Sequence, residues 1–238
     1  MPTIACGCLG LLGIAAVVLI VGFVLVLPSL PGIVAQFAGL SPRGETEAVF
    51  ADATPIPTIA LQNAIQPTQV TVSLGEYGTE TLNTNNTLYE FTIGSGAVGE
   101  QMAVASFSEQ GLLDLCRQRS PICSDNPPDP RFRNPRIDLR PGGAVVYVDV
   151  TLPELGGFTQ TAGVVLQLDG TRRQFAVAGV DLGGMLYQVP PEQFGTTIEQ
   201  VQMQGNQLLN QLSVEAGGGR FNLSEVQIDD STLTLILR

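Results

Sequence analysis

The chain has 238 residues, and charged residues make up 14% of it, against roughly 25% in an average soluble domain. It contains 11 basic and 22 acidic residues, and every basic residue is Arg, so His, Lys and Trp are absent. The absence of His excludes Ser-His-Asp and Cys-His catalysis, and the absence of Lys excludes phosphate-binding and Schiff-base lysines. The formal net charge of -11 argues against nucleic acid as a partner, because binding to phosphates depends on Lys and Arg.

A long uncharged segment close to the N-terminus, residues 4–27, predicts a transmembrane helix. A helix of this length measures about 36 Å, and the hydrocarbon core of a bilayer is about 30 Å thick. A cleaved signal peptide is the alternative, but its apolar stretch is shorter and follows a basic start. We therefore interpret residues 1–30 as an uncleaved single-pass anchor in the cell membrane.

The cysteines bear on the orientation of this anchor. Cys116 and Cys123 flank a short loop, which predicts a disulfide in an oxidising compartment, with two free thiols as the alternative. We therefore expect a cytoplasmic N-terminus and an extracytoplasmic location for the bulk of the chain. The remaining cysteines, Cys6 and Cys8, lie at the membrane end of the chain, and cysteines divided between that end and this loop do not form a zinc site, so no metal site is predicted.

The segment after the anchor, residues 31–69, begins with an uncharged interfacial part and continues as a stretch rich in Pro, Thr and Ala. Such linkers are extended and semi-rigid, which predicts a spacer between the membrane and the rest of the chain. Residues 70–238 then form one β-rich extracytoplasmic domain. Within it, apolar and polar residues alternate over 70–74 and 87–93, and the NTNN turn between these segments predicts an antiparallel pair.

A short helix is predicted next, because Ser106 and Glu109 have the spacing of a capping box. Alternation over 137–152 around Pro-Gly-Gly predicts a hairpin, and residues 162–184 predict a second pair of strands. A long amphipathic helix over 190–212 precedes a terminal hairpin that ends in three alternating leucines. Antiparallel strands with one short and one long amphipathic helix indicate an α+β fold.

The long helix carries an apolar stripe in which residues recur every three or four positions. In one interpretation the stripe packs against a sheet as ordinary core, and in the other it lines an apolar groove that holds a ligand. Only a core that fails to fill its space leaves room for a ligand, so both interpretations remain open. The candidate groove residues are Phe194, Ile198, Val201, Leu208 and Leu212.

An arginine cluster stands out from the acidic background. Six of the 11 arginines lie within residues 117–140, which hold only three carboxylates and therefore carry a local charge of +3. Such a patch suits anionic lipid headgroups or an acidic partner, or else its arginines hold a Pro-rich loop in place through carboxylates and carbonyl groups. The six residues are Arg117, Arg119, Arg131, Arg133, Arg136 and Arg140.

The order of these pieces carries a resemblance to a known group of proteins. The motifs are FSEQGLLDLC, IDLRPGGAVVYVDVTLP, VAGVDLGGMLYQVP, the long helix and QIDDSTLTLIL, and together they cover about residues 106–238. They resemble the YpmS-like membrane-anchored bacterial proteins and the LmeA-like proteins. This resemblance implies a tubular lipid-binding-like domain, in which a long helix lies in a curved sheet and the apolar interior holds acyl chains.

The functional prediction combines these features. No cofactor is expected, and carboxylates alone do not predict a hydrolase, because 22 of them make some close pair inevitable. We predict a non-enzymatic, single-pass membrane protein whose extracytoplasmic domain binds or shields a lipid or other apolar ligand, with membrane lipid as its partner. The alternative is a structural or accessory subunit of a larger membrane protein complex.

Overall fold

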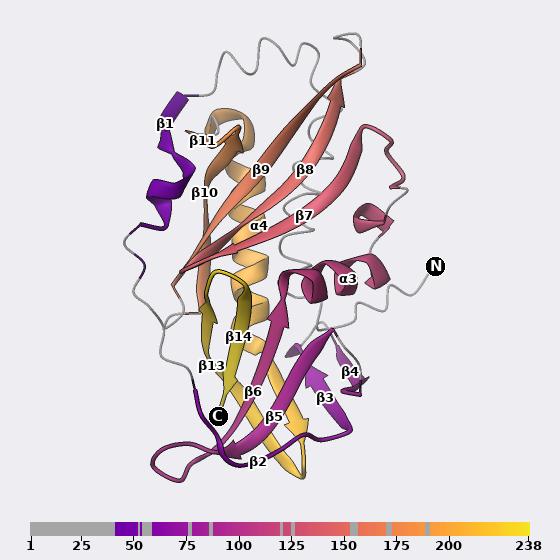
Figure 1. Cartoon of the computed structure of the whole chain (residues 1–238), viewed down its shortest axis with the longest axis vertical. Helices are drawn as coiled ribbons and strands as arrows, with labels where there is room; N and C mark the ends of the chain where they lie inside the picture. Colours follow the sequence, from indigo (N-terminus) through magenta and orange to yellow (C-terminus); the bar gives the residue numbers. More distant parts are fainter. Residues whose placement is uncertain are drawn as a thin grey trace.

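A computed structural model describes residues 41–51, 53, 59–75, 78–85, 88–119, 121–124, 127–152, 157–169, 173–188 and 191–238. Two antiparallel sheets follow one another along the long axis of the molecule, with a long helix running beside both (Figure 1). The predicted α+β class is confirmed. The predicted anchor lies outside the described residues, and no helix within them has the length and apolarity needed to cross a membrane.

The upper sheet of Figure 1 has six strands in the order β1-β11-β10-β9-β8-β7. The predicted hairpin over 137–152 is confirmed as β7 and β8, and its turn places Gly142 at a φ of 75°, which favours glycine. The predicted pair over 162–184 is confirmed as β9 and β10. The strands are β1 (Ser41–Glu45), β7 (Phe132–Arg140), β8 (Gly143–Leu152), β9 (Phe158–Asp169), β10 (Gln174–Leu182) and β11 (Met185–Gln188).

The lower sheet has eight strands in the order β2-β5-β6-β14-β13-β12-β3-β4. The predicted pairing of residues 70–74 with 87–93 is wrong, because β3 pairs with β4 and β12 while β5 pairs with β2 and β6. The intervening β4 has one apolar residue, Leu82, so alternation could not reveal it. The strands are β2 (Gln62–Ile65), β3 (Gln69–Ser73), β4 (Thr79–Asn83), β5 (Tyr89–Ser95), β6 (Gln101–Ser108), β12 (Ser213–Ala216), β13 (Gly219–Ile228) and β14 (Thr232–Leu237).

The two predicted helices are α3 (Glu109–Arg119) and α4 (Pro191–Gln211). The predicted capping box is wrong, because Ser106 lies within β6. Ser108 caps α3 instead, since its Oγ accepts a hydrogen bond from the Gly111 N–H at 3.1 Å. The Glu109 carboxylate accepts the backbone N–H of Leu139 on β7 at 2.8 Å, so it joins the helix to the upper sheet.

Residues Ser41–Phe50, which we name the strap, differ from the extended linker predicted over 31–69. They form β1 and the short 3-10 helix η3 (Thr46–Val49), and they pack on the outer face of the upper sheet. The Thr46 hydroxyl donates a hydrogen bond to the buried carboxylate of Asp181, and the Thr46 N–H donates to the Gly184 carbonyl at 2.9 Å. The β-rich unit therefore begins before residue 70. One strand and one turn of 3-10 helix are too short to show a period in the sequence.

Candidate functional site

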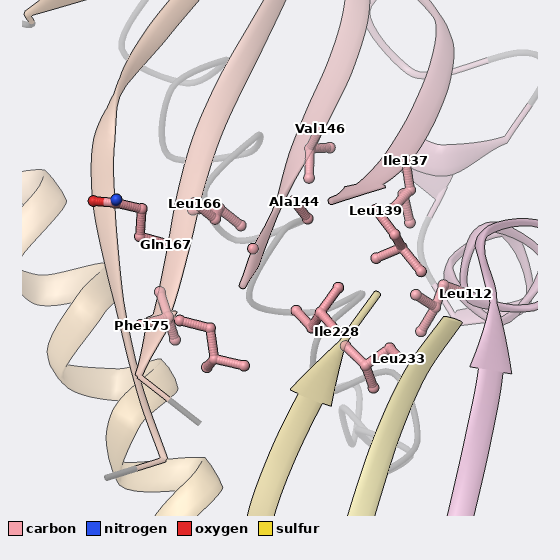
Figure 2. A pocket seen from close by; sticks show the side chains of 12 residues that line it. Leu112, Ile137, Leu139, Ala144, Val146, Leu166, Gln167, Phe175, Ile228 and Leu233 are labelled. Atoms are coloured by element: carbon pink, nitrogen blue, oxygen red, sulfur yellow. The ribbon is translucent and has the colours of Figure 1, made fainter. Parts of the chain in front are cut away.

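An apolar pocket lies where the two sheets meet (Figure 2). Its walls come from four strands of the upper sheet, from the β13–β14 hairpin of the lower sheet and from α3. It is partly open and has a volume of about 30 Å³. The lining residues are Leu112, Ile137, Leu139, Gly143, Ala144, Val146, Leu166, Gln167, Leu168, Phe175, Ile228 and Leu233.

The chemistry of this pocket follows from strand alternation. Ala144, Val146 and Leu166 point to the inner face of the upper sheet, because side chains two residues apart on a strand share a face. Gln167 is the one polar side chain among the lining residues, and its Nε2 donates to the Val49 carbonyl of the strap at 3.2 Å. Figure 2 shows its amide directed away from the other lining side chains. The pocket therefore offers apolar contacts.

The size of the pocket limits what it holds. An engineered protein cavity of about 150 Å³ binds benzene, whereas this pocket has a volume of about 30 Å³. Its present shape accommodates a group of one or two carbon atoms. A longer apolar chain requires one wall to move.

The predicted groove residues of α4 do not line this pocket. Val201, Leu208 and Leu212 are buried within the core that joins both sheets, and Ile198 is partly buried. The Phe194 side chain lies outside the described side chains. A ligand-lining role for these five residues stays a prediction.

The polar face of α4 holds a strand through side-chain amides, a function that its sequence pattern does not reveal. Asn206 accepts the Phe175 N–H through Oδ1 at 2.8 Å and donates to the Phe175 carbonyl through Nδ2 at 3.2 Å. Gln202 Oε1 accepts the Val177 N–H at 2.8 Å. Residues four apart on a helix and two apart on a strand are both separated by roughly 6 Å, so the two spacings match. The Gln and Asn pattern was visible in the sequence, but its strand partner was not.

The arginines on and after α3 have partners within the chain. Arg131 pairs with Asp129, with an Nη2 to Oδ2 distance of 2.6 Å, and Arg117 pairs with Asp114 at 3.0 Å. The hydrogen bond from Arg131 holds the pKa of Asp129 below its ordinary value, against the effect of burial. The exposed Arg133 donates from Nε to a backbone carbonyl at 3.2 Å. The side chain of Arg119 lies outside the described side chains.

Arg136 belongs to a polar cluster on the outer face of the upper sheet. Asp149 accepts hydrogen bonds from Thr161 at 2.6 Å, from Asn134 at 2.9 Å and from Arg136 at 3.4 Å. Burial raises the pKa of Asp149, but the two shorter hydrogen bonds and the Arg136 charge outweigh burial, so the pKa lies below 3.8. The Asp149 carboxylate is therefore stabilised in its charged form.

Arg140 connects this face to the strap. It pairs with Asp138 at 2.8 Å and with Glu47 at 3.0 Å, and the hydrogen bond to Asp138 raises its pKa. Burial and the nearby Asp181 charge raise the pKa of Tyr147 on the same face. These contacts favour the structural interpretation of the arginine cluster, while contact with anionic headgroups or a partner stays a prediction.

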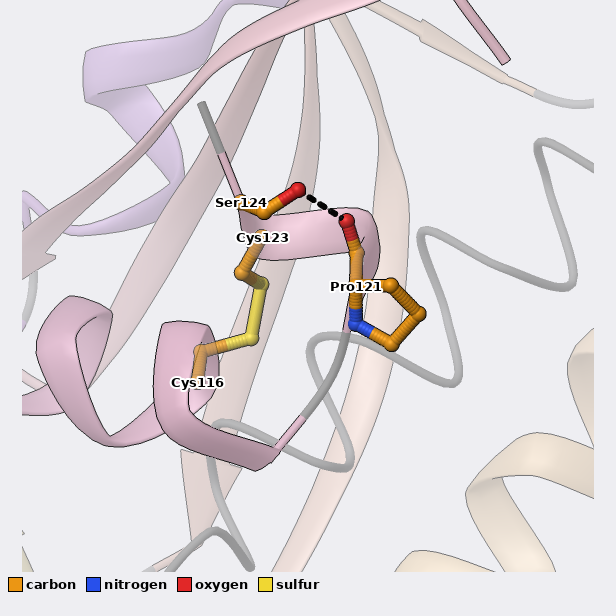
Figure 3. Close-up of a disulfide and its surroundings, with 4 residues drawn as sticks. All are labelled: Cys116, Pro121, Cys123 and Ser124. Atoms are coloured by element: carbon orange, nitrogen blue, oxygen red, sulfur yellow. Dashed lines mark hydrogen bonds between the residues drawn. A yellow bond between two sulfur atoms is a disulfide. The ribbon is translucent and has the colours of Figure 1, made fainter. Parts of the chain in front are cut away.

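The predicted disulfide is confirmed (Figure 3). Cys116 and Cys123 are both buried, with Cα atoms 5.7 Å apart, and they join the last turns of α3 to the 3-10 helix η5 (Pro121–Cys123). Ser124 Oγ donates to the Pro121 carbonyl at 2.6 Å and closes η5. The bond fixes the C-terminal half of α3, one turn beyond the pocket residue Leu112.

Comparisons with known proteins do not assign a function to this chain. No family model, curated protein or solved structure matches the chain. In the described part of the chain, no three His, Cys, Asp or Glu residues are grouped so that they could hold a metal ion. The resemblance to YpmS-like and LmeA-like proteins stays a prediction.

Proposed function

We propose that this chain is a non-enzymatic, membrane-anchored protein that binds an apolar chain, such as the acyl chain of a lipid, in the pocket between its two sheets. The observation that carries this proposal is the lining of the pocket. Eleven of its twelve lining residues have no polar side-chain atom. Each buried methylene group of a ligand contributes about 0.8 kcal/mol in such surroundings.

The membrane part of the proposal is supported by the sequence. Residues 4–27 contain no charged side chain, and the first charge in the chain is Arg43. The strap begins at Ser41, so a strand of the upper sheet is the first element in the described part of the chain. A lipid-binding pocket in this unit would lie within a short chain length of its source of lipid.

Photolabelling of the full chain in membrane vesicles tests this function. The probe is palmitic acid with a diazirine on its chain, and we expect labelled peptides from residues 137–146 and 228–233. Ala144→Leu adds three carbon atoms to the pocket and should lower labelling at least about tenfold, because they displace two or more methylene groups of the ligand. Ala162→Leu is the matched control, since Ala162 is equally buried on the inner face without lining the pocket.

The outcome of this comparison decides the proposal. Labelling spread evenly over the surface, or equal labelling of Ala144→Leu and the parent chain, would overturn it. Thermal melting of both variants checks that they remain folded.

A second function, a structural or accessory subunit of a membrane complex, is favoured by a different observation. The stripe of α4 is packed into a continuous core, with Val201 6% exposed and Leu212 3% exposed. A domain filled in this way would act through its surface. Recovery of a stoichiometric partner after crosslinking in membranes, without photolabelling of the pocket, would favour this second function.

A further inference from the structure

The first half of β10, Gln174–Val177, is held in an unusual way. On one side it pairs with β9 in a regular antiparallel ladder. On the other side β11 pairs only with Val180–Leu182, so within the described residues the backbone of the first half has no strand neighbour there. The side-chain amides of Gln202 and Asn206 take the place of a strand through three hydrogen bonds.

This half of β10 forms one wall of the pocket. Phe175 lines the pocket and is 4% exposed, and its own backbone N–H and carbonyl are the groups that Asn206 holds. Figure 2 shows Phe175 across the pocket from Leu112 and Leu139. Apart from its ladder with β9, this wall is therefore held in position by one asparagine and one glutamine of α4.

The walls formed by β7, β8 and β9 are fixed more firmly. Ala144 and Leu166 lie on β8 and β9, which have backbone ladders on both sides. The edge strand β7 packs against α3, which the Cys116–Cys123 bond and the Glu109 contact to Leu139 hold in place. Side-chain amides rotate far more readily than a paired strand separates. On the side away from its ladder with β9, the first half of β10 is consequently easier to displace than the walls formed by β7, β8 and β9.

The strand also has a place to bend. The register of β10 against β9 shifts between Val177 and Gly179, which separates the first half of the strand from the second. The second half cannot follow easily, because Gly179 lies directly against the Tyr187 carbonyl of β11. A displacement of residues 174–177 can therefore occur with the second half in place.

We propose that the first half of β10 is a movable wall of the pocket and that Gln202 and Asn206 are the latch that holds it closed. This proposal rests on the proposed function and assigns the site to an unbranched alkyl chain. The closed pocket of about 30 Å³ excludes such a chain. Release of Phe175 from Asn206 lets the wall swing outward and gives the chain room. Asn206 and Gln202 are thus positioning residues that act through Phe175.

Hydrogen exchange of the full chain in membrane vesicles, with and without added palmitic acid, tests the moving wall. Ligand binding ordinarily slows exchange, but here the peptide covering residues 173–179 should exchange about fivefold faster with palmitic acid, since its amides lose their helix partners. The peptide covering residues 143–150 should exchange no faster. If Asn206 had a purely structural role, palmitic acid would not speed exchange over residues 173–179 while leaving exchange over residues 143–150 no faster.

A variant tests the latch. Asn206→Leu removes both bonds to Phe175 and should raise the rate of labelling by photoreactive palmitic acid about fivefold. Asn210→Leu, at an exposed position one turn further along α4, is the matched control and should label like the parent chain. Melting temperatures of both variants establish that each is folded.

The outcomes separate the two proposals. If the parent chain is not labelled in the pocket, both the proposed function and the moving wall are overturned. If the pocket is labelled but exchange over residues 173–179 stays the same or slows, only the moving wall is overturned. Labelling of Asn206→Leu at the rate of the parent chain likewise contradicts the latch alone.

Discussion

The two sheets differ in how many of their faces are buried. In the upper sheet, Val145 and Val165 point to the outer face and are only 1% and 0% exposed, because Phe50 of the strap packs over them. In the lower sheet, a row of outer-face residues that includes Ser106 and Thr234 is polar and partly exposed. Covering a sheet on its second face thus depends on a segment from elsewhere in the chain.

The sequence carries this difference in its patterns. The upper sheet contains uninterrupted apolar runs, AVVYV in β8 and VVL in β9, which are typical of strands buried on both faces. In the lower sheet apolar and polar residues mostly alternate, as in Tyr89–Ile93, which is typical of strands with one solvent-exposed face. Ile236 is an exception, being 0% exposed between two inward leucines. The runs show that a second face is buried, but they do not show which segment covers it.

Removing the cover should have the largest effect on stability. Phe50→Ala deletes the ring that packs on Val145 and Val165, and we expect a loss of about 3 kcal/mol in the free energy of unfolding. Urea denaturation of the full chain in detergent micelles, followed by circular dichroism, measures this change. Val98→Ala in the β5–β6 turn of the lower sheet is the control, since Val98 is 89% exposed. A loss below about 1 kcal/mol for Phe50→Ala would contradict packing of the strap.

Replacing Val by Thr on the covered outer face should have the next largest effect on the free energy of unfolding, and the reverse replacement on the open outer face should have little effect. Val165→Thr buries a hydroxyl group on the covered face and should cost about 2 kcal/mol, because the group lacks a partner there. Thr234→Val makes the reverse change on the open face of the lower sheet and should alter stability by less than about 0.5 kcal/mol. The same denaturation experiment measures both. Equal effects of the two variants would show that the faces do not differ in burial.

Much of the fold could be predicted where the pattern was local. The β7–β8 and β13–β14 hairpins have strong alternation and turn residues between neighbouring strands, and α4 has a sustained apolar stripe. The pairing of β3 with β12 could not be predicted, since about 140 residues separate them and alternation carries no information on distant partners. The strap could not be predicted either, because its strand is too short to show alternation and pairs with the distant β11.

The candidate site was predictable in its chemistry but not in its position. The apolar stripe of α4 indicated either a ligand groove or ordinary core. The sequence of an amphipathic helix has the same pattern in both cases. The pocket arises where ends of β7–β10 meet the β13–β14 hairpin, and no short sequence motif marks such a junction. The amides of Gln202 and Asn206 could be recognised only once their strand partner was placed.

A substitution at Ser108, where β6 of the lower sheet leads into α3, should have a smaller effect on the free energy of unfolding. Ser108 ends β6 of the lower sheet and caps α3, so Ser108→Ala should cost about 1 kcal/mol in the free energy of unfolding. Ser106→Ala, two residues earlier on the outer face, is the matched control and should cost less than about 0.5 kcal/mol. Denaturation of both variants by urea distinguishes them. A larger loss for Ser106→Ala would favour the capping box that the sequence predicted.

The smallest effect concerns the part of the upper outer face that the strap leaves polar. Asp149→Asn weakens the bonds from Thr161, Asn134 and Arg136, and we expect a loss of about 0.5 to 1 kcal/mol at neutral pH. Because the pKa of Asp149 in the folded chain lies below its ordinary value of 3.8, its stabilisation is complete above that value. It disappears as the pH falls through the folded pKa.

The difference in unfolding free energy between the parent chain and Asp149→Asn should therefore be constant from neutral pH to about pH 5 and shrink below about pH 4. Urea denaturation at a series of pH values measures this difference. Asp230→Asn, in the exposed β13–β14 turn, is a control for general charge effects. A difference that grows as the pH falls would mean that Asp149 is stabilised in its protonated form, and the polar cluster would then act as neutral hydrogen bonds between strands.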